Sequence, residues 1–290
     1  AMAQLAEARG FESIWVPDHV IMPTRIVSTY PYTKSGGFIA DPKGSHLDPI
    51  TSLAFVAGCT KRVRLGFSVL VAPYRHPVVT GKMMATIDVL SNGRLNVGVG
   101  AGWLNEEFEA LGVPTERKWA RTEEHIRIWK ELWTAEEPKY DGLYHSFSHV
   151  QCRPQPLQKP HPPITIGGNG KACFRRVVAL ADGWQVVSEA PDDVYSMGGD
   201  LKTALATLYQ IAEEAGRVYP SMRLEPAPYR RQTGYFLHHD GQYQVSFRSP
   251  ERGGRAFRIK SEHTCFLPGT AARTQREIRQ AGRVRMPGRG

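Results

Sequence analysis

Two residues with proton-transfer chemistry, Asp18 and His19, stand just after a short apolar run at residues 14–16. The run is stopped by Pro17, which predicts a buried strand that ends in a loop. A histidine side chain titrates near neutral pH and therefore suits general acid–base catalysis. A lone histidine is more often a polar surface residue or a helix cap, and an aspartate beside it can simply cap the loop. The residues alone leave both roles open.

A glycine-rich stretch, GVGAG at residues 98–102, follows a second apolar run. It does not match the dinucleotide fingerprint G-x-G-x-x-G, because the third glycine position falls on Trp103 or on Asn105. Two interpretations remain. The stretch is either a tight turn after a strand or a backbone that approaches a flat ring closely, since glycine has no Cβ.

A second glycine-rich stretch, GGNG at residues 167–170, lies between the apolar run 164–166 and a predicted helix that begins at Lys171. Exposed N–H groups and the dipole at a helix N-terminus favour an anion. An ordinary turn is the alternative, but three glycines in four residues at this position favour a phosphate site.

The elements that must position these residues alternate between apolar strands and helices. Strands are expected at residues 13–16, 63–71, 94–99, 164–166 and 184–187. Helices are expected at 49–59, with Asp48 as a candidate N-cap, and at 76–90, 105–111, 115–133, 171–181 and 193–215. This alternation predicts a parallel sheet covered by helices, either a barrel or an open doubly wound sheet. An opening helix at 2–9 without a strand before it implies a missing first strand. Two further strands beyond Gly216 would be needed to close a barrel.

One connection is too long for an ordinary loop. Residues 21–46 are polar, contain glycines and prolines, and include the aromatic residues Tyr30, Tyr32 and Phe38. Connections of this length are usually functional or mobile. We interpret the segment as a lid that excludes water from a site at the end of the first strand.

The composition limits the class of protein. The chain has 290 residues, 41% hydrophobic, and one α/β barrel takes about 250 residues. No apolar stretch approaches the length of a membrane span, and the first ten residues show no secretion signal. The four cysteines are scattered without C-x-x-C spacing. We therefore expect a cytoplasmic protein without disulfides, a metal site or a membrane partner.

The net charge of +9 comes wholly from the last part of the chain. Residues 229–290 hold 13 Lys and Arg against 4 Asp and Glu, while residues 1–228 hold 24 of each. The neutral body argues against nucleic-acid binding. The tail has no convincing period, so we expect one domain at 1–228 and an Arg-rich tail at 229–290 outside the fold. A disordered extension and a shifted reading frame both explain the tail, and its composition favours the second.

Three runs carry a resemblance to a known family. They are FESIWVPDHV, SVLVAPYRHPVVTGKMMATIDVLSNGRLNVGVGAGW and PPITIGGNGKACFRRVVALADGW. They resemble the luciferase-like monooxygenase superfamily, and more narrowly its branch that uses the deazaflavin coenzyme F420. The resemblance covers about residues 3–216. It implies a (β/α)₈ TIM barrel, here incomplete, with the cofactor ring at the carboxyl ends of the strands.

The resemblance also implies roles for individual residues. His19 matches the catalytic histidine near the reactive ring face. Ser68 and Val69 match a bulge where deazaflavin members hold a non-prolyl cis peptide against the ring. The residues implied to contact the cofactor are Asp18, His19, Ser68, Val69, Gly100, Gly102, Trp103, Asn105, Gly167, Gly168 and Asn169.

The function implied is hydride transfer between coenzyme F420 and a small organic substrate, with His19 as acid, base or polarising group. One alternative is a monooxygenase that uses reduced FMN and O₂. Another is a degenerate, non-catalytic flavin-binding subunit. A homodimer is expected if the full barrel forms.

Overall fold

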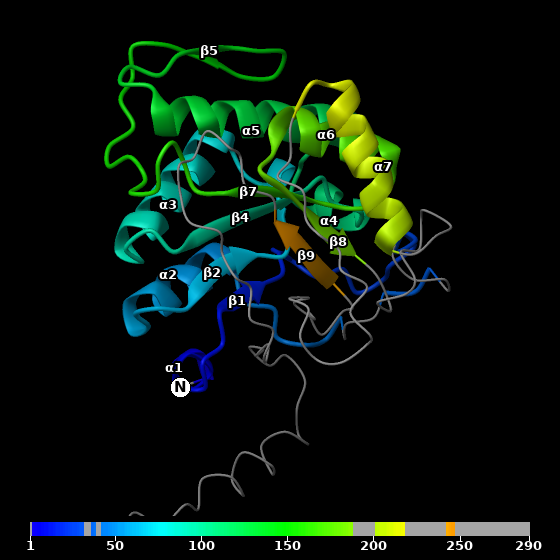
Figure 1. Ribbon diagram of the computed structural model, residues 1–290. Coiled ribbons are helices and arrows are strands. Elements are labelled where there is room, and N and C mark those ends of the chain that lie inside the picture. Colours follow the sequence, from blue (N-terminus) through cyan, green and yellow to red (C-terminus); the bar gives the residue numbers. More distant parts are fainter. Residues whose placement is uncertain (1, 32–35, 39–41, 188–200, 218–241, 247–290) are drawn as a thin grey trace, which may run out of the picture.

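The computed structural model describes residues 2–31, 36–38, 42–187, 201–217 and 242–246 (Figure 1). Its centre is one sheet in the order β1-β2-β4-β7-β8-β9, in which β3 also pairs with β4. The strands are β1 (Ser13–Val16), β2 (Arg64–Phe67), β3 (Leu70–Val71), β4 (Leu95–Gly100), β7 (Ile164–Gly167), β8 (Gly183–Val187) and β9 (Gln242–Ser246). From β1 to β8 the strands are parallel and follow chain order. This absence of a reversal is the arrangement of a barrel, not of a doubly wound sheet, and the predicted fold class is confirmed.

Helices pack along one side of this sheet (Figure 1). They are α1 (Met2–Ala8), α2 (Pro49–Cys59), α3 (Pro77–Leu90), α5 (Lys118–Thr134), α6 (Lys171–Leu180) and α7 (Leu201–Glu214). The short helix α4 (Asn105–Ala110) lies apart from this layer, because its Phe108 packs with Val71 and with Tyr74 of the 3-10 turn η1 (Ala72–Tyr74). The expected start of the last helix, at 193–200, lies outside the described residues. The expected excursion after α5 is the antiparallel hairpin β5 (Tyr140–Asp141) and β6 (Ser146–Phe147).

The local sequence explains where α2 and α3 begin and end. Asp48 caps α2, because its Oδ1 accepts the Thr51 N–H at 2.8 Å, and Pro49 occupies the first position. α3 likewise begins with a proline. After α3, Asn92 and Gly93 take φ values of 58° and 74°, which make the tight turn into β4.

The two faces of the sheet have different characters. The helix-facing side chains are apolar and fully buried, and they pack with helix residues such as Trp129 and Phe174 in one continuous core. They include Leu65, Phe67, Leu95, Val97, Val99, Ile164, Ile166 and Trp184. The opposite face carries glycines and polar groups, among them Gly66, Asn96, Gly98, Thr165 and Gln185. This glycine-rich face lies inside the incomplete barrel.

The strand expected at residues 63–71 is in fact two strands. β2 pairs with the start of β4 and β3 with its end, and Ser68 and Val69 lie between them. The peptide bond between Ser68 and Val69 is cis, which confirms that prediction. The apolar run concealed the interruption because all of its residues except Arg64 and Val69 are buried.

The described part of the Arg-rich tail is β9, which pairs with β8 in antiparallel orientation. A further unit of a (β/α)₈ barrel would supply a parallel strand. The rest of 229–290 lies outside the described residues, so its separation from the fold stays a prediction. Among the residues that the structure describes, no helix is long and apolar enough to cross a membrane.

Candidate active site

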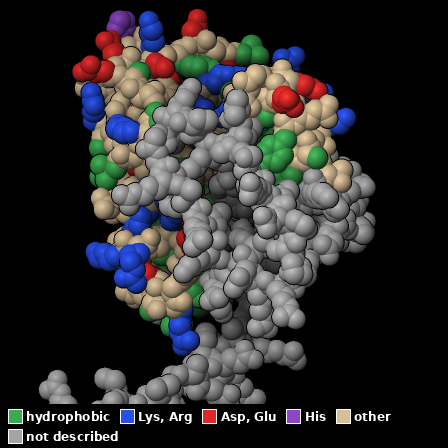
Figure 2. All heavy atoms as spheres, viewed as in Figure 1, with side chains coloured by type: hydrophobic (Ala, Val, Ile, Leu, Met, Phe, Trp, Pro, Cys, Tyr) green, Lys and Arg blue, Asp and Glu red, His purple; other side chains and the backbone are tan. Residues whose placement is uncertain are grey.

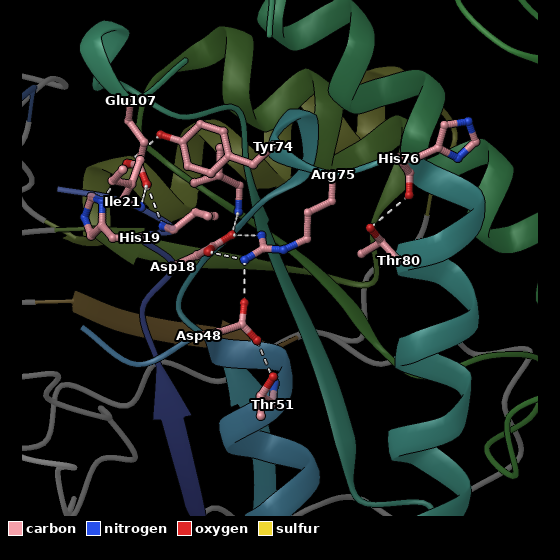
Figure 3. Close-up of polar contacts among 12 residues, drawn as sticks. Asp18, His19, Ile21, Asp48, Thr51, Tyr74, Arg75, His76, Thr80 and Glu107 are labelled. Carbon is pink, nitrogen blue, oxygen red and sulfur yellow. Dashed lines mark hydrogen bonds and ion pairs between the residues drawn. The ribbon is translucent and has the colours of Figure 1, made fainter. Parts of the chain in front are cut away.

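The carboxyl ends of β1, β2, β4 and β7 bring the predicted site residues to one edge of the sheet. Asp18 and His19 follow β1, Ser68 and Val69 follow β2, residues 100–105 end β4, and residues 167–169 end β7. Because these strands are adjacent and parallel, their ends form one mouth. Figure 3 shows the part around Asp18 and His19.

A buried glutamate of α4, Glu107, is the centre of the polar network in the mouth (Figure 3). Its Oε2 lies 2.8 Å from Nδ1 of His19 and accepts the hydroxyl of Tyr74 at 2.9 Å. Its Oε1 accepts the main-chain N–H groups of Val20 at 2.6 Å and Ile21 at 3.1 Å. One carboxylate therefore fixes the imidazole and the chain that follows it.

The network determines which nitrogen of His19 is free for chemistry. Burial opposes ionisation of Glu107, but its bonds from His19, Ile21 and Tyr74 outweigh burial and lower its pKa. Burial and the nearby Glu107 raise the pKa of Tyr74, so its hydroxyl remains a donor. An ionised Glu107 can only accept, and Nδ1 of His19 must carry a proton. In neutral His19, the lone pair is therefore on Nε2.

Asp18 does not share the surroundings of His19, although it is adjacent in sequence. Its Oδ2 accepts a hydrogen bond from Nη1 of Arg75 at 2.7 Å, and its Oδ1 accepts one from Nη2 at 2.9 Å. Oδ2 also accepts a bond from the Val71 main-chain N–H. Arg75 in turn donates to Asp48, the cap of α2. Burial raises the pKa of Asp18, while the ion pair with Arg75 opposes that shift. The structure thus gives Asp18 a role in holding β1, η1 and α2 together, and its predicted contact with a cofactor stays a prediction.

The floor of the mouth is the partly exposed side chain of Val69, flanked by residues without side chains. A Cβ at Gly100 would come within 2.5 Å of one Val69 methyl, and a Cβ at Gly167 within 2.6 Å of the other. Val69 therefore fills the space between the ends of β4 and β7. Gly102 takes a φ of 80°, and a Cβ there would come within 2.7 Å of Phe108 and of Val71, so only glycine fits this turn.

The glycine-rich turn after β7 is anchored on β8. The Gly168 carbonyl accepts a hydrogen bond from the indole N–H of Trp184 at 2.6 Å, and the Gly168 N–H donates to the Gln185 carbonyl at 3.3 Å. Gly168 and Gly170 have φ values of 125° and 96°, which glycine alone adopts easily. Asn169 lies between them at the start of α6. The predicted phosphate contact of this turn is untested.

Aromatic side chains from the long connection meet the mouth. The ring of Phe38 lies 5.3 Å from that of His19 and 5.1 Å from that of Trp103. Tyr30 lies 5.0 Å from Trp103, and His46 lies 5.8 Å from His19. The expected lid segment thus contacts the site through Tyr30 and Phe38. Its residues 32–35, which include Tyr32, and 39–41 lie outside the described part.

The same connection is attached to α4 by a second glutamate. Glu106 accepts the N–H groups of Val27 at 2.6 Å and Ser28 at 2.8 Å. The Ser28 hydroxyl accepts a hydrogen bond from the Asn105 main-chain N–H at 3.1 Å. The side-chain oxygen of Asn105 accepts one from the Lys118 ammonium group. Burial opposes ionisation of Glu106, but bonds from Ser28 and Val27 lower its pKa to about 2.

Replacing Glu106 with alanine is expected to release residues 27 and 28 while leaving the His19 network in place. Hydrogen exchange followed by NMR should show the Val27 and Ser28 amides exchanging about tenfold faster or more, since bonds to a charged acceptor are strong. The amides of Val20 and Ile21, held by Glu107, are the internal control and should not change. Equal acceleration at all four amides would contradict separate attachment points.

This attachment also depends on pH in a defined direction. The pKa of Glu106 is lowered in the folded protein from its ordinary 4.5 to about 2. Its contribution to stability is therefore complete above pH 4.5 and disappears as the pH falls toward 2.

Sequence reasoning missed three residues of this site, namely Glu107, Tyr74 and Arg75. The available signal was the pair of acidic residues in the first turn of the helix after the fourth strand, where negative charge suits the helix dipole. The sequence does not say which of the two faces His19, because that depends on how α4 lies on the sheet.

Comparison with known proteins shows which family the chain resembles. The sequence model of the luciferase-like monooxygenase family matches residues 1–227. A protein of Mycobacterium tuberculosis is 35% identical over 218 residues, which are 75% of this chain and 74% of the relative. The FMNH₂-dependent dimethylsulfone monooxygenase of Pseudomonas putida is 28% identical over 208 residues, 71% of this chain and 52% of the relative.

A solved structure with the same fold is an F420-dependent secondary alcohol dehydrogenase in complex with an F420–acetone adduct. It matches with a TM-score of 0.57 at 19% identity, over 75% of this chain and 60% of that chain. The chain thus spans little more than half the length of some of the proteins it matches. The family match and the shared fold together show that the chain belongs to the luciferase-like monooxygenase family.

Proposed function

We propose that this chain is the core of an oxidoreductase that binds coenzyme F420 and transfers a hydride to or from a small organic substrate. The observation that carries the proposal is the His19–Glu107 pair, which lies at the same end of the sheet as the glycine-flanked Val69. The likeness in fold to an F420-dependent dehydrogenase supports the cofactor.

The residues present fit a flat ring system. The floor at Val69 is bordered by Gly100 and Gly167, so no side chain of those two residues rises beside it. The two glycines leave room for the Val69 side chain itself, and a ring could lie on Val69 without meeting a side chain of residue 100 or 167. When bound, coenzyme F420 supplies hydride transfer at C5 of its ring.

The chain's own residues supply the proton chemistry. Glu107 holds Nδ1 of His19 and so directs Nε2 to accept or donate a proton at the substrate oxygen. Tyr74 and the amides of Val20 and Ile21 keep Glu107 in place. The aromatic residues Tyr30, Phe38 and Trp103 exclude water from one side of the mouth.

The second candidate is a monooxygenase that uses reduced FMN and O₂. The similarity to the FMNH₂-dependent monooxygenase of Pseudomonas putida favours this candidate. So does the similarity to the oxygenase component of a flavin-dependent trigonelline monooxygenase from Acinetobacter baylyi, which is 32% identical over 168 residues. The same mouth would hold either ring, and the proton chemistry of His19 applies to both.

A titration of the full chain with each cofactor distinguishes these candidates. Fluorescence quenching should show saturable binding of F420 that is tighter than that of FMN. Gly100→Ala places a methyl group in the space of a Val69 methyl and should weaken binding. Gly58→Ala, where a Cβ meets nothing within 4 Å, is the matched control. Tighter FMN binding would support the monooxygenase, and binding of neither would contradict the proposal.

We also propose that the chain associates with a second copy of itself through α2 and α3. Large apolar side chains are exposed on these two helices, with Phe55 73%, Val79 50%, Met83 43% and Leu90 59% exposed. On α3, Val79, Met83 and Leu90 lie four and seven residues apart, which places them along one face of the helix, with the polar Thr86 between the last two. An exposed apolar stripe of this kind indicates a helix–helix contact.

The charge distribution favours a second copy as the partner. α2 has no charged residue, and α3 has only Lys82 and the fully buried Asp88. Two copies of such a surface can meet about a two-fold axis without placing like charges against each other.

Met83→Glu is expected to give a monomer, because burying an unpaired carboxylate in the contact is unfavourable. Light scattering after gel filtration should give wild-type protein at twice the chain mass of 32.4 kDa and the variant at that mass. Leu143→Glu, at a 71% exposed position in the β5–β6 hairpin, is the matched control and should stay dimeric. A monomeric wild type would refute the dimer.

A further inference from the structure

Gln185, in the middle of β8, reaches across the interior of the incomplete barrel to the end of β2. Its Nε2 donates to the Ser68 hydroxyl at 2.8 Å, and both side chains are buried, at 2% exposure. In the sheet, β4 and β7 lie between β8 and β2. The bond therefore links two non-adjacent strands beneath the mouth.

The backbone of β4 leaves room for this bond. A Cβ at Gly98 would lie 2.4 Å from the Gln185 side-chain oxygen and 2.0 Å from the Phe67 carbonyl oxygen. Any side chain at position 98 would therefore displace the Gln185 amide. The glycine that the sequence placed in a ring-binding loop serves here to let a polar side chain cross the interior.

Ser68 is held from two sides, and it directly precedes the floor residue. Its N–H donates to the Val16 carbonyl on β1 at 2.8 Å, and its hydroxyl accepts from Gln185 on β8. The next residue, Val69, fits between Gly100 and Gly167. The position of Ser68 thus determines where the floor of the mouth lies relative to the ends of β4 and β7.

We propose that Gln185 is a positioning residue for cofactor binding. It acts through Ser68, whose hydroxyl it fixes so that Val69 forms a floor of defined height. The inference rests on the proposed function, because it takes the floor at Val69 as the surface on which the cofactor ring lies. The Gln185 side chain lies in the interior and reaches the mouth through this bond, while its main-chain carbonyl, which accepts the Gly168 N–H, is retained when the side chain is replaced.

The interior offers a way to separate this role from general stability. Among the described residues, the Gln185 side-chain oxygen and the Thr165 hydroxyl are buried and have no hydrogen-bond partner. Replacing Gln185 with methionine removes one bond but also one unpaired buried oxygen, so its effect on folding should be small. Thr165→Val removes the other unpaired oxygen from the same face without touching the Ser68 bond, which makes it the matched control.

The test is a double-mutant cycle on the full chain, with dissociation constants for F420 and FMN measured by fluorescence quenching and melting temperatures measured without cofactor. Gln185→Met and Ser68→Ala should each weaken binding of the preferred cofactor about three- to tenfold. The double variant should be no weaker than either single variant, because both changes remove the same bond. Thr165→Val should bind as wild type does, and all four variants should melt within a few degrees of wild type.

Several outcomes would overturn the inference. Wild-type affinity in Gln185→Met, or losses that add in the double variant, would show that Gln185 does not act through Ser68. An equal loss of affinity in Thr165→Val would show that the weaker cofactor binding comes from disturbed packing of the interior and not from loss of the Ser68 bond. A wild type that binds neither cofactor would overturn the proposed function together with this inference, whereas the first three outcomes would overturn the inference alone.

Discussion

Replacing His19 with alanine is expected to lower turnover by about 10²–10⁴-fold, the usual contribution of a general acid–base group. His19 is bonded through Nδ1 to an ionised carboxylate, so Nε2 is the nitrogen that can exchange a proton with the substrate. The side chain is 12% exposed in a loop at the barrel mouth. Glu107 keeps its bonds from Tyr74, Val20 and Ile21 in the variant, so the melting temperature should change little.

The measurement is the steady-state oxidation of reduced cofactor with a substrate that the wild type accepts. His19→Asn is the sharper companion variant, because its amide can still donate to Glu107 but cannot take up a proton at neutral pH. It should be about as inactive as the alanine variant while binding the cofactor normally. Unchanged turnover in either variant would show that His19 is not the acid–base group of the reaction.

Replacing Arg94 with methionine should lower the free energy of unfolding by about 3 kcal/mol or more. The Arg94 side chain is buried, and its guanidinium donates to the carbonyls of Ala57 and Thr60 at the end of α2. It also donates to the Val63 carbonyl before β2 and to the Ser91 carbonyl after α3. Methionine fills much of the space but leaves these buried acceptors without a donor.

Urea unfolding at neutral pH followed by circular dichroism provides the measurement. Arg62→Met, at an exposed arginine of the neighbouring turn, is the control and should change stability by less than about 0.5 kcal/mol. If the two variants unfold at the same urea concentration, the Arg94 bonds contribute nothing beyond an ordinary surface arginine.

The features that depended on local sequence were predictable. Apolar runs alternating with amphipathic helices predicted a parallel sheet covered by helices. The order of β1, β2, β4, β7 and β8 along the chain followed from the family resemblance, which implied a barrel and not a doubly wound sheet. The cap at Asp48 and the turn at Asn92 also follow from near neighbours. Because parallel strand ends meet at one edge, the predicted site residues were bound to converge.

The features that depended on long-range packing were not predictable. His19 and Glu107 are 88 residues apart, and their contact depends on the position of α4 over the mouth. Asp18 is adjacent to His19, yet its carboxylate turns to Arg75, 57 residues further on. In the sequence, Gln185 is a single polar residue in an apolar strand, and only the folded sheet shows that it contacts Ser68. Family resemblance located the mouth, but the direction of each side chain came from the structure.

A crystal structure of the full chain grown with coenzyme F420 would show whether the mouth that contains His19 holds a flavin-type ring. We predict electron density for the ring against Val69, at the ends of β4 and β7, with Nε2 of His19 facing the ring or the substrate space above it. Density for the ring at any other place on the protein, with the mouth filled by the chain's own side chains, would show that the mouth is not the cofactor site.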